Sequence, residues 1–399
     1  MQQSQSLTPS RALKFVLICG IVNLFADMTY EGARSINGAY LQMLGASAAV
    51  VGFTAGLGEL IGYGFRSVTG FISDRTGKYW LMTISGYIIN VLAVPALALA
   101  GNWQIAAALM VAERTGRAIR KPSTEAMLSF ASKEVGTGKT FGLVESLDQI
   151  GATVGPLIIA LTLFLGHSYR VGYSILLAPA LLTIAIVIVA YFLFPHPQKL
   201  EASKPLETKG LSQPYWMYMG AGACIAAGFA DFSLIAYHFQ TTGSVATSLI
   251  PVFYAVAMAM GAVSAYLFGK LFDRIGIRMI VIAFAMSAFF APLVFLEKTW
   301  LALTGMLLWG IGLGAQDSLL KAVIVPVIPA NKRSTAFGLF DSGFGIAWFL
   351  GSWLMGLLYG RSLPALIVFS VVLQLSSLPL FLIAKKMQLN ETRFDPGAR

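Results

Sequence analysis

Long apolar runs separated by short polar segments form the pattern of this 399-residue chain. Most runs hold roughly 20 residues, the length that a helix needs to cross the apolar core of a bilayer. A longer polar segment, Pro195 to Gln213, divides the runs into two groups of six. The pattern predicts twelve membrane-spanning helices, near residues 14–37, 47–69, 80–100, 103–123, 140–165, 171–194, 215–239, 246–268, 278–296, 300–325, 335–359 and 362–384.

The composition also indicates a membrane protein. Hydrophobic residues make up 57% of the chain and charged residues 12%, with a mean hydropathy of +0.73, whereas a soluble domain is about 25% charged. Cys19 and Cys224 lie inside apolar runs, where small buried hydrophobes are more common than a disulfide. The first run lacks a small-residue cleavage site, so we expect a retained span rather than a signal peptide.

A polar stretch recurs at half the chain length. Four identities share an offset of 199 residues, namely Gly70/Gly269, Asp74/Asp273, Arg75/Arg274 and Gly77/Gly276. Residues 25–27 and 141–146 have similar counterparts at 229–231 and 337–342. Self-similarity at a fixed period indicates an internal repeat. The predicted domains are therefore an N-terminal six-helix bundle at 1–194, a linker at 195–213 and a C-terminal six-helix bundle at 214–399.

The stretch 70–78 reads G-x-x-x-D-R-x-G-K and resembles the signature loop between spans two and three of the major facilitator superfamily of transporters. The resemblance implies an all-α integral membrane protein with twelve transmembrane helices in two pseudo-symmetric six-helix bundles. Substrate is then expected near the bilayer midplane, where the halves meet. The resemblance also implies a gate motif, made of Gly70, Asp74, Arg75, Gly77, Lys78, Asp273 and Arg274.

The gate motif leads to two expected contacts. A helix amino terminus carries unpaired N–H groups and partial positive charge, which a carboxylate can satisfy. Asp74 is therefore expected at the start of the eleventh span, near residues 334–336. Asp273 is expected to make the equivalent contact near residues 140–141 at the start of the fifth span.

Span five carries a second recognisable pattern. Gly142, Gly151, Gly155 and Pro156 follow G-x8-G-x3-G-P, which resembles the motif of the drug:proton antiporter branch of the superfamily. This resemblance implies proton-coupled export of a small organic compound. Glycine and proline are also common kinking residues in membrane helices, so a structural role stays open.

The placement of lysine and arginine predicts the orientation. With the amino terminus inside, the inner loops and tails hold most of these residues, and the outer loops hold only Arg170, Lys298 and Arg361. Inner loops retain positive charge, so we expect a multi-pass protein of the cell (cytoplasmic, inner) membrane with both termini and the linker in the cytoplasm. The net charge of +10 is scattered over these loops, which argues against nucleic-acid binding.

Span four is dense in charge, and an ionisable group within a span is a functional candidate. Arg114 lies near mid-membrane, where its planar guanidinium can hold an anionic or polar substrate group. Arg117, Arg120 and Lys121 lie nearer the inner surface, where long side chains reach the headgroups.

Ion pairs are the structural alternative for these charges. At 1.5 Å per residue, Glu145 of span five comes to the depth of Arg117, and Asp148 to that of Arg114. The sequence predicts intramembrane ion pairs that involve Glu113, Arg117, Glu145 and Asp148, with Asp341 as the repeat counterpart of Glu145.

Proton coupling is expected from span one and its repeat. Asp27 and Glu31 share a helical face with Arg34, and Asp231 occupies the matching place in span seven. Desolvation beside another carboxylate favours the protonated acid, and an approaching cation favours the ionised form. Asp27, Glu31 and Asp231 are thus the proton-coupling candidates. Alternatively, Glu31 and Arg34 satisfy one another.

Neighbouring side chains complete the expected site. Tyr30, Phe232 and Tyr237 lie beside the acidic positions in sequence and, with Arg114, are the substrate-cavity candidates. His238 is expected to be solvated at the outer interface.

No closely spaced metal-ligand cluster, nucleophile elbow or phosphate-binding glycine loop occurs in the sequence. We therefore expect no enzymatic activity, no cofactor and no metal. The favoured function is a monomeric secondary active transporter that works by alternating access, with protons, the bilayer and a small-molecule substrate as its partners. Its most favoured action is proton-coupled export of a drug-like compound or metabolite. Transport of an organic anion recognised by Arg114, or a non-transporting sensor on the same fold, are the alternatives.

Overall fold

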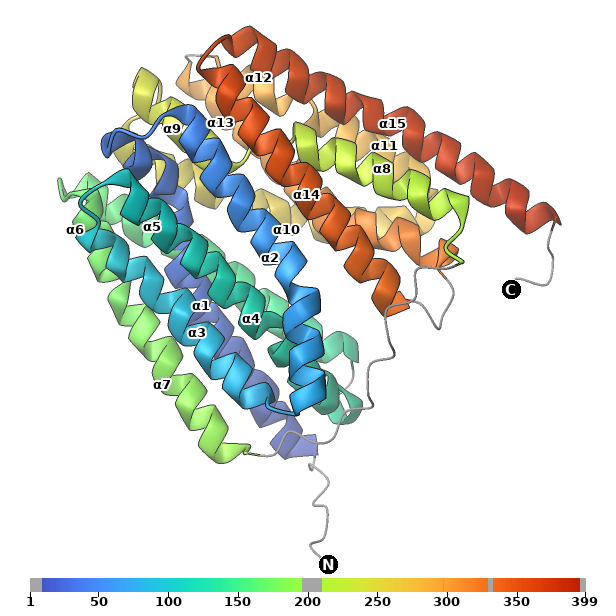
Figure 1. Ribbon diagram of the computed structural model, residues 1–399, viewed down its shortest axis with the longest axis horizontal. Coiled ribbons are helices and arrows are strands. Elements are labelled where there is room, and N and C mark those ends of the chain that lie inside the picture. Colours follow the sequence, from blue (N-terminus) through green and yellow to red (C-terminus); the bar gives the residue numbers. More distant parts are fainter. Residues whose placement is uncertain (1–8, 136, 196–209, 297, 329–332, 395–399) are drawn as a thin grey trace, which may run out of the picture. The chain divides into compact units, whose positions relative to one another are not determined.

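The computed structural model describes residues 9–135, 137–195, 210–296, 298–328 and 333–394, and within these ranges it contains helices and turns but no strand (Figure 1). The first half holds α1 (Pro9–Met43), α2 (Ala48–Thr76), α3 (Tyr79–Ala96), α4 (Trp103–Val135), α5 (Thr137–Phe164), α6 (Tyr169–Ile175) and α7 (Leu177–Leu193). The second half holds α8 (Gln213–Gly228), α9 (Phe232–Thr242), α10 (Ile250–Ile275), α11 (Ile277–Ser287), α12 (Phe290–Val294), α13 (Thr299–Ile324), α14 (Arg333–Tyr359) and α15 (Leu363–Phe394).

Eleven helical segments of the described residues are long and apolar enough to cross a membrane. Three of them consist of two consecutive helices, namely α6 with α7, α8 with α9, and α11 with α12. The remaining predicted span is α4, which has 33 residues but carries many charges. The predicted all-helical membrane fold is therefore confirmed.

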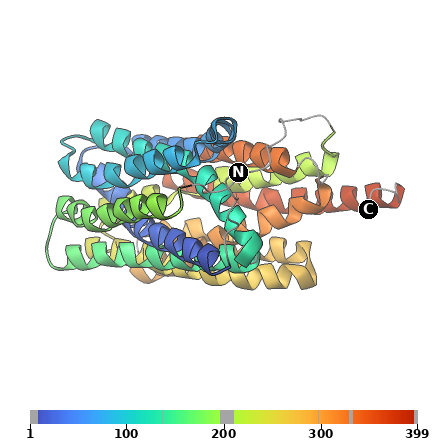
Figure 2. The same cartoon turned by 90° about the horizontal axis from the view of Figure 1, so that it is seen from below.

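The chain forms two compact units, and in Figures 1 and 2 each is a bundle of long helices. One comprises Met1–Ile36 and Phe65–Lys204, and the other Asn37–Gly64 and Pro205–Arg399. The last part of α1 and the first part of α2 thus belong to the second unit. The predicted domain division follows the sequence repeat instead, and it stays a prediction.

The repeated polar stretch is mostly helix rather than loop, which corrects the sequence interpretation. Only Gly77 and Lys78 separate α2 from α3. Ser73 and Thr76 are helical, and their hydroxyls donate to the carbonyls of Thr69 and Ile72, one turn earlier, at 2.8 and 2.7 Å. Polar side chains that bond within the helix in this way do not require a loop.

The repeated glycine ends its helix in the same way in both halves. Gly77 has a φ of 65° and Gly276 a φ of 59°. Each N–H donates to the carbonyl four residues earlier, that of Ser73 or Phe272, at 2.8 Å. A side chain disfavours positive φ, so glycine is the residue suited to this helix end.

In the first unit, α4 continues past Pro122 to Val135, further than predicted. Proline has no N–H and frees the carbonyl four residues earlier. That carbonyl, of Ala118, accepts a hydrogen bond from the Thr69 hydroxyl at 2.8 Å. One turn further on, the hydroxyls of Ser73 and Ser123 lie 2.7 Å apart. These bonds join α2 to α4 where the proline removes a backbone hydrogen bond from α4.

Close packing of α3 against α4 fixes the position of the charged helix. A Cβ at Gly116 would meet the backbone of Gly86 and Asn90 within 2.8 Å, and one at Gly86 would lie 2.7 Å from the Arg120 backbone N. Small residues let membrane helices approach this closely. The side chains of α4 that face α3 are therefore held in a fixed register.

We expect Gly116→Ala to destabilise the protein by about 1–3 kcal/mol, because overpacking forces the two backbones apart. The matched control is Gly220→Ala in α8, where a Cβ would meet nothing within 4 Å. This control should be neutral or stabilise by up to about 1 kcal/mol through helix propensity. Thermal unfolding of the purified variants measures both effects, and equal melting temperatures would contradict the close α3–α4 contact.

Candidate functional site

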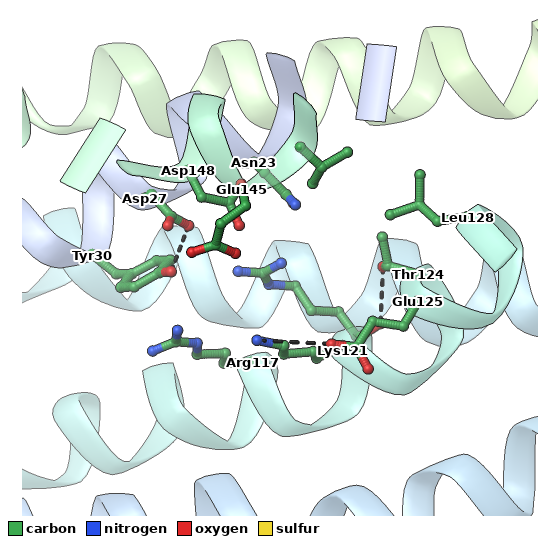
Figure 3. Close-up of a pocket in the computed structure, with 12 residues that line it drawn as sticks. Asn23, Asp27, Tyr30, Arg117, Lys121, Thr124, Glu125, Leu128, Glu145 and Asp148 are labelled. Atoms are coloured by element: carbon green, nitrogen blue, oxygen red, sulfur yellow. Dashed lines mark hydrogen bonds and ion pairs between the residues drawn. The ribbon is translucent and has the colours of Figure 1, made fainter. Parts of the chain in front are cut away.

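A cavity of about 390 Å³ lies within the first unit, between α1, α4 and α5 (Figure 3). Charged side chains dominate its lining, with a few polar and apolar ones. The lining residues are Asn23, Asp27, Tyr30, Arg117, Arg120, Lys121, Thr124, Glu125, Leu128, Val144, Glu145 and Asp148.

Asp27 of α1 is buried at this cavity, with 7% of its surface exposed. The Tyr30 hydroxyl, one turn along the same helix, donates to its Oδ1 at 2.5 Å. The structure thus places a proton-coupling candidate and a substrate-cavity candidate side by side. Their roles stay predictions.

Arg117 of α4 is one of the cations that line the cavity. Its guanidinium carbon lies 4.6 Å from the centre of the Tyr30 ring, a cation–π distance. Its Nη1 lies 4.0 Å from Oε1 of Glu31, and that carboxylate oxygen also lies 3.8 Å from Nη1 of Arg34. The expected pairing of Glu31 with Arg34 is thus present, and Arg117 extends it. The Arg117 Nε is buried without a hydrogen-bond partner among the described residues.

Arg120 does not reach toward headgroups, which corrects the expectation from sequence. It is 4% exposed, with its guanidinium 4.3 Å from the centre of the Tyr87 ring of α3. Its Nε donates to Oδ1 of Asn90 at 3.2 Å. The Asn90 amide in turn donates to Glu113 Oε1 at 2.7 Å. Arg120 and Glu113 are therefore bridged by one buried amide.

The partners on α3 were not found from the sequence. Asn90 and Tyr87 are single polar groups in an apolar run, and Tyr87 donates to Oδ1 of Asn23 at 2.6 Å. The available signal was that an uncharged polar residue within a span needs a hydrogen-bond partner. That signal does not name the partner.

On α5, the two carboxylates differ in their surroundings. Glu145 is exposed and accepts from the Gln149 amide at 3.0 Å. Asp148 Oδ1 is buried without a hydrogen-bond partner among the described residues. The two arginines that were expected to pair with Glu145 and Asp148 have other partners in the structure. Arg117 pairs with Glu31, and Arg114 pairs with Glu113 at 3.5 Å.

The remaining candidates do not line this cavity. Arg114 lies on α4 away from it, and Asp341 lies on α14 in the second unit. Phe232 is buried with its ring 4.4 Å from that of Tyr254, and Tyr237 packs on Tyr359 at 5.5 Å.

His238 corrects another expectation. It is fully buried rather than solvated, and its Nδ1 lies 3.0 Å from the Tyr359 hydroxyl.

Asp231 has a clear structural role at a break in span seven. It is 3% exposed, lies between α8 and α9, and its carboxylate accepts from the Ser233 N–H at 2.8 Å as the N-cap of α9. Side chains also bind the carbonyl groups that the break leaves without helical partners. The Gly228 carbonyl accepts from Ser370 at 2.6 Å, and the Ala230 carbonyl accepts from Trp309 at 2.9 Å.

The gate residues lie at helix ends. Gly70 and Arg75 are in the last turns of α2, Arg274 is in that of α10, and Lys78 precedes α3. The side chains of Asp74 and Asp273 lie outside the described residues, so their predicted contacts stay predictions. Among the residues that the structure describes, no group of three His, Cys, Asp or Glu is arranged to hold a metal ion.

The family model of the Major Facilitator Superfamily matches residues 16–352 of the chain. The chain belongs to that superfamily. It is therefore a membrane transporter and not an enzyme.

Relatives extend over nearly the full length of this facilitator. An uncharacterized protein of Mycobacterium tuberculosis is 36% identical over 375 residues, 92% of both chains. An uncharacterized MFS-type transporter of Methanocaldococcus jannaschii is 24% identical and covers 91% of this chain and 93% of its own. The crystal structure of the nucleoside transporter NupG matches with a TM-score of 0.73 at 12% identity, over 94% and 98% of the two chains. The last match shows the shared fold.

The buried amide network of this facilitator leads to a prediction. Asn90→Ala should leave Glu113 and Arg120 without their shared partner, and each unsatisfied group costs about 1–3 kcal/mol. Thermal unfolding measures the loss. The control is Glu125→Gln on α4, the helix that carries Glu113 and Arg120, because Glu125 is 55% exposed and its pair with Lys121 at 3.8 Å is worth about 0–1 kcal/mol. A loss no larger than that of the control would contradict the bridging role.

The N-cap at Asp231 leads to a further prediction. Asp231→Ala should destabilise the protein by about 1 kcal/mol, whereas Asp231→Asn and Asp231→Ser keep a capping oxygen and most of the stability. Melting temperatures of the three variants measure this order. If all three melt alike while transport is lost in each, the carboxylate acts on transport and not as a cap.

Proposed function

We propose that this facilitator exports a small organic compound in exchange for protons, with Asp27 as the main proton carrier. The observation that carries the proposal is the buried Asp27 carboxylate in a cavity that also holds Asp148 and the cations of α4. A buried carboxylate changes protonation when its neighbours change. Alternating access can supply such a change by opening and closing the cavity.

The surroundings of Asp27 contain groups that favour each protonation state. The Tyr30 hydroxyl and the guanidinium groups of Arg117 and Arg120 favour the ionised form. Burial and the neighbouring Asp148 favour the protonated form. A modest movement of α1 against α4 or α5 would change this balance, which is the behaviour that a proton-coupled transporter needs.

The antiporter-like glycines support export through their position. Gly151 and Gly155 of α5 pack directly on α1, where a Cβ at Gly151 would lie 3.1 Å from the Asp27 Cβ and one at Gly155 would lie 2.9 Å from the Met28 carbonyl carbon. A movement of α5 therefore acts on the backbone that carries Asp27. The surroundings of Gly142 lie outside the described residues, and Pro156 lies within α5.

Transport of an organic anion is the second candidate. Its expected recognition residue moves from Arg114 to Arg117, because Arg114 does not line the cavity while the Arg117 Nε is buried there without a partner among the described residues. The positive-inside distribution of Lys and Arg supports the cell membrane with both termini in the cytoplasm. We propose a monomer, because one chain carries both of the predicted six-helix repeats.

Asp27→Asn should abolish proton-driven transport and leave substrate binding and counterflow exchange largely intact, because the amide imitates the protonated acid in size and polarity. Everted membrane vesicles that build an inward proton gradient measure this with acridine orange. A compound exported in exchange for protons restores the quenched fluorescence. We expect recovery in wild-type vesicles and the level of protein-free vesicles in the Asp27→Asn variant.

The control variant is Glu125→Gln, which removes an exposed carboxylate at the same cavity. It should keep proton coupling. Wild-type recovery in Asp27→Asn vesicles would exclude Asp27 as the proton carrier. If no compound among organic cations, organic anions, dyes and dipolar ions restores fluorescence in wild-type vesicles above the protein-free level, the proposed exchange is wrong.

A further inference from the structure

The cavity presents opposite charges on facing sides. In Figure 3 the carboxylates of Asp27, Glu145 and Asp148 lie on one side, and Arg117 and Lys121 lie opposite them. The anionic side comes from α1 and α5, whereas the side that α4 provides carries Arg117, Arg120 and Lys121 together with Glu125, the partner of Lys121. A ligand in this space therefore meets both signs of charge.

Existing contacts satisfy most of these charges. Asp27 accepts from Tyr30, Glu145 from Gln149, and Lys121 pairs with Glu125. Arg120 is similarly held by Asn90 on α3.

Two polar atoms at the cavity are left over. The Arg117 Nε is a donor and the Asp148 Oδ1 is an acceptor, both buried without a hydrogen-bond partner among the described residues. A buried polar atom without a partner is costly, so each of these atoms requires a further partner, either a water molecule or a group of a bound ligand. The ligand that completes this one must bring an acceptor to Arg117 and a donor to Asp148.

We propose that the cavity binds a small dipolar ion of the amino-acid type, with its carboxylate toward Arg117 and its ammonium group toward Asp148. The proposal rests on the proposed function, because the same cavity would then carry the transported compound. Under this proposal the substrate is neither a simple organic cation nor a simple organic anion.

The charge count of the lining favours such a ligand. Arg117, Arg120 and Lys121 stand against Asp27, Glu125, Glu145 and Asp148, three cations against four carboxylates. When Asp27 holds a proton, the formal charges balance. A ligand without net charge keeps this balance, whereas a lone cation or anion adds an unbalanced charge to a partly buried site.

The size and the apolar part of the cavity set the scale of the ligand. About 390 Å³ is near the lower end of the range of about 300–1,000 Å³ for small-molecule pockets. Leu128 and Val144 offer apolar contacts beside the charged walls. A single amino acid with an apolar side chain matches these features better than a large amphipathic compound.

A matched series of probes tests the charge requirement on the purified full-length protein in lipid nanodiscs. Leucine carries both charges, leucinamide only the cation, 4-methylpentanoate only the anion, and all three share one apolar group. Binding is measured by thermal stabilisation, alongside the other common amino acids. We expect stabilisation by one or more dipolar amino acids and affinities weaker by about tenfold or more for the matching amide and acid, as expected for loss of a charge-assisted contact.

Two variants test which residue binds the carboxylate of the ligand and which binds its ammonium group. Asp148→Asn should weaken binding of the dipolar ion and reduce its advantage over the acid. Arg117→Gln should weaken the same binding and reduce its advantage over the amide. Glu145→Gln is the matched control, since Glu145 is exposed and already bonded to Gln149, and it should change the selectivity less. Melting temperatures without ligand show that each variant folds.

The proposal is overturned if the amide or the acid binds as tightly as the amino acid, or if no amino acid stabilises the protein. It is also overturned if Asp148→Asn and Arg117→Gln leave the selectivity unchanged. These binding measurements do not require proton transport. Binding of dipolar ions without proton movement in the vesicle assay would refute only the proposed exchange, and proton movement evoked by simple cations or anions alone would refute only the dipolar ligand.

Discussion

The structure of the first unit depends on how the charges of α4 are held inside an apolar layer. An ionised side chain away from water is stable only with close partners. Two neighbouring helices supply them, since α1 brings Glu31 and Tyr30, and α3 brings Asn90. The close approach of α3 at Gly116 is required for the last of these contacts. Helix packing and charge pairing in this unit are therefore one constraint.

The sequence predicts most of the fold because the relevant signals are local. Hydrophobic length identifies the spans, and the glycine at 77 and 276 marks a helix end in both halves. Side chains on one helical face were also correctly grouped, as for Glu31 and Arg34. In contrast, Arg120 was assigned to the headgroups because its partner Asn90 lies on another helix. The rotation of one helix relative to its neighbour cannot be predicted from the sequence of either helix alone.

The repeat also shows where similar sequences receive different structures. Asp27 lies within the continuous helix α1 and faces a cavity, whereas Asp231 caps α9 after the break between helices α8 and α9. The side chains of Ser370 and Trp309 stabilise that break by binding its free carbonyl groups. The two aspartates match in sequence, yet only the first is at the charged cavity. The surrounding helices, not the local motif, determine this difference.

The charge of α4 has a consequence for how the chain enters the membrane. Charged residues near the centre of a helix oppose insertion by about 2.5–3.5 kcal/mol each, and α4 is absent from the segments that are apolar enough to cross alone. During synthesis α3 precedes α4, so Asn90 and the Gly86 surface are available when α4 leaves the ribosome. We expect the two helices to insert as a hairpin, in which α3 acts as an internal chaperone for the most polar span of the transporter.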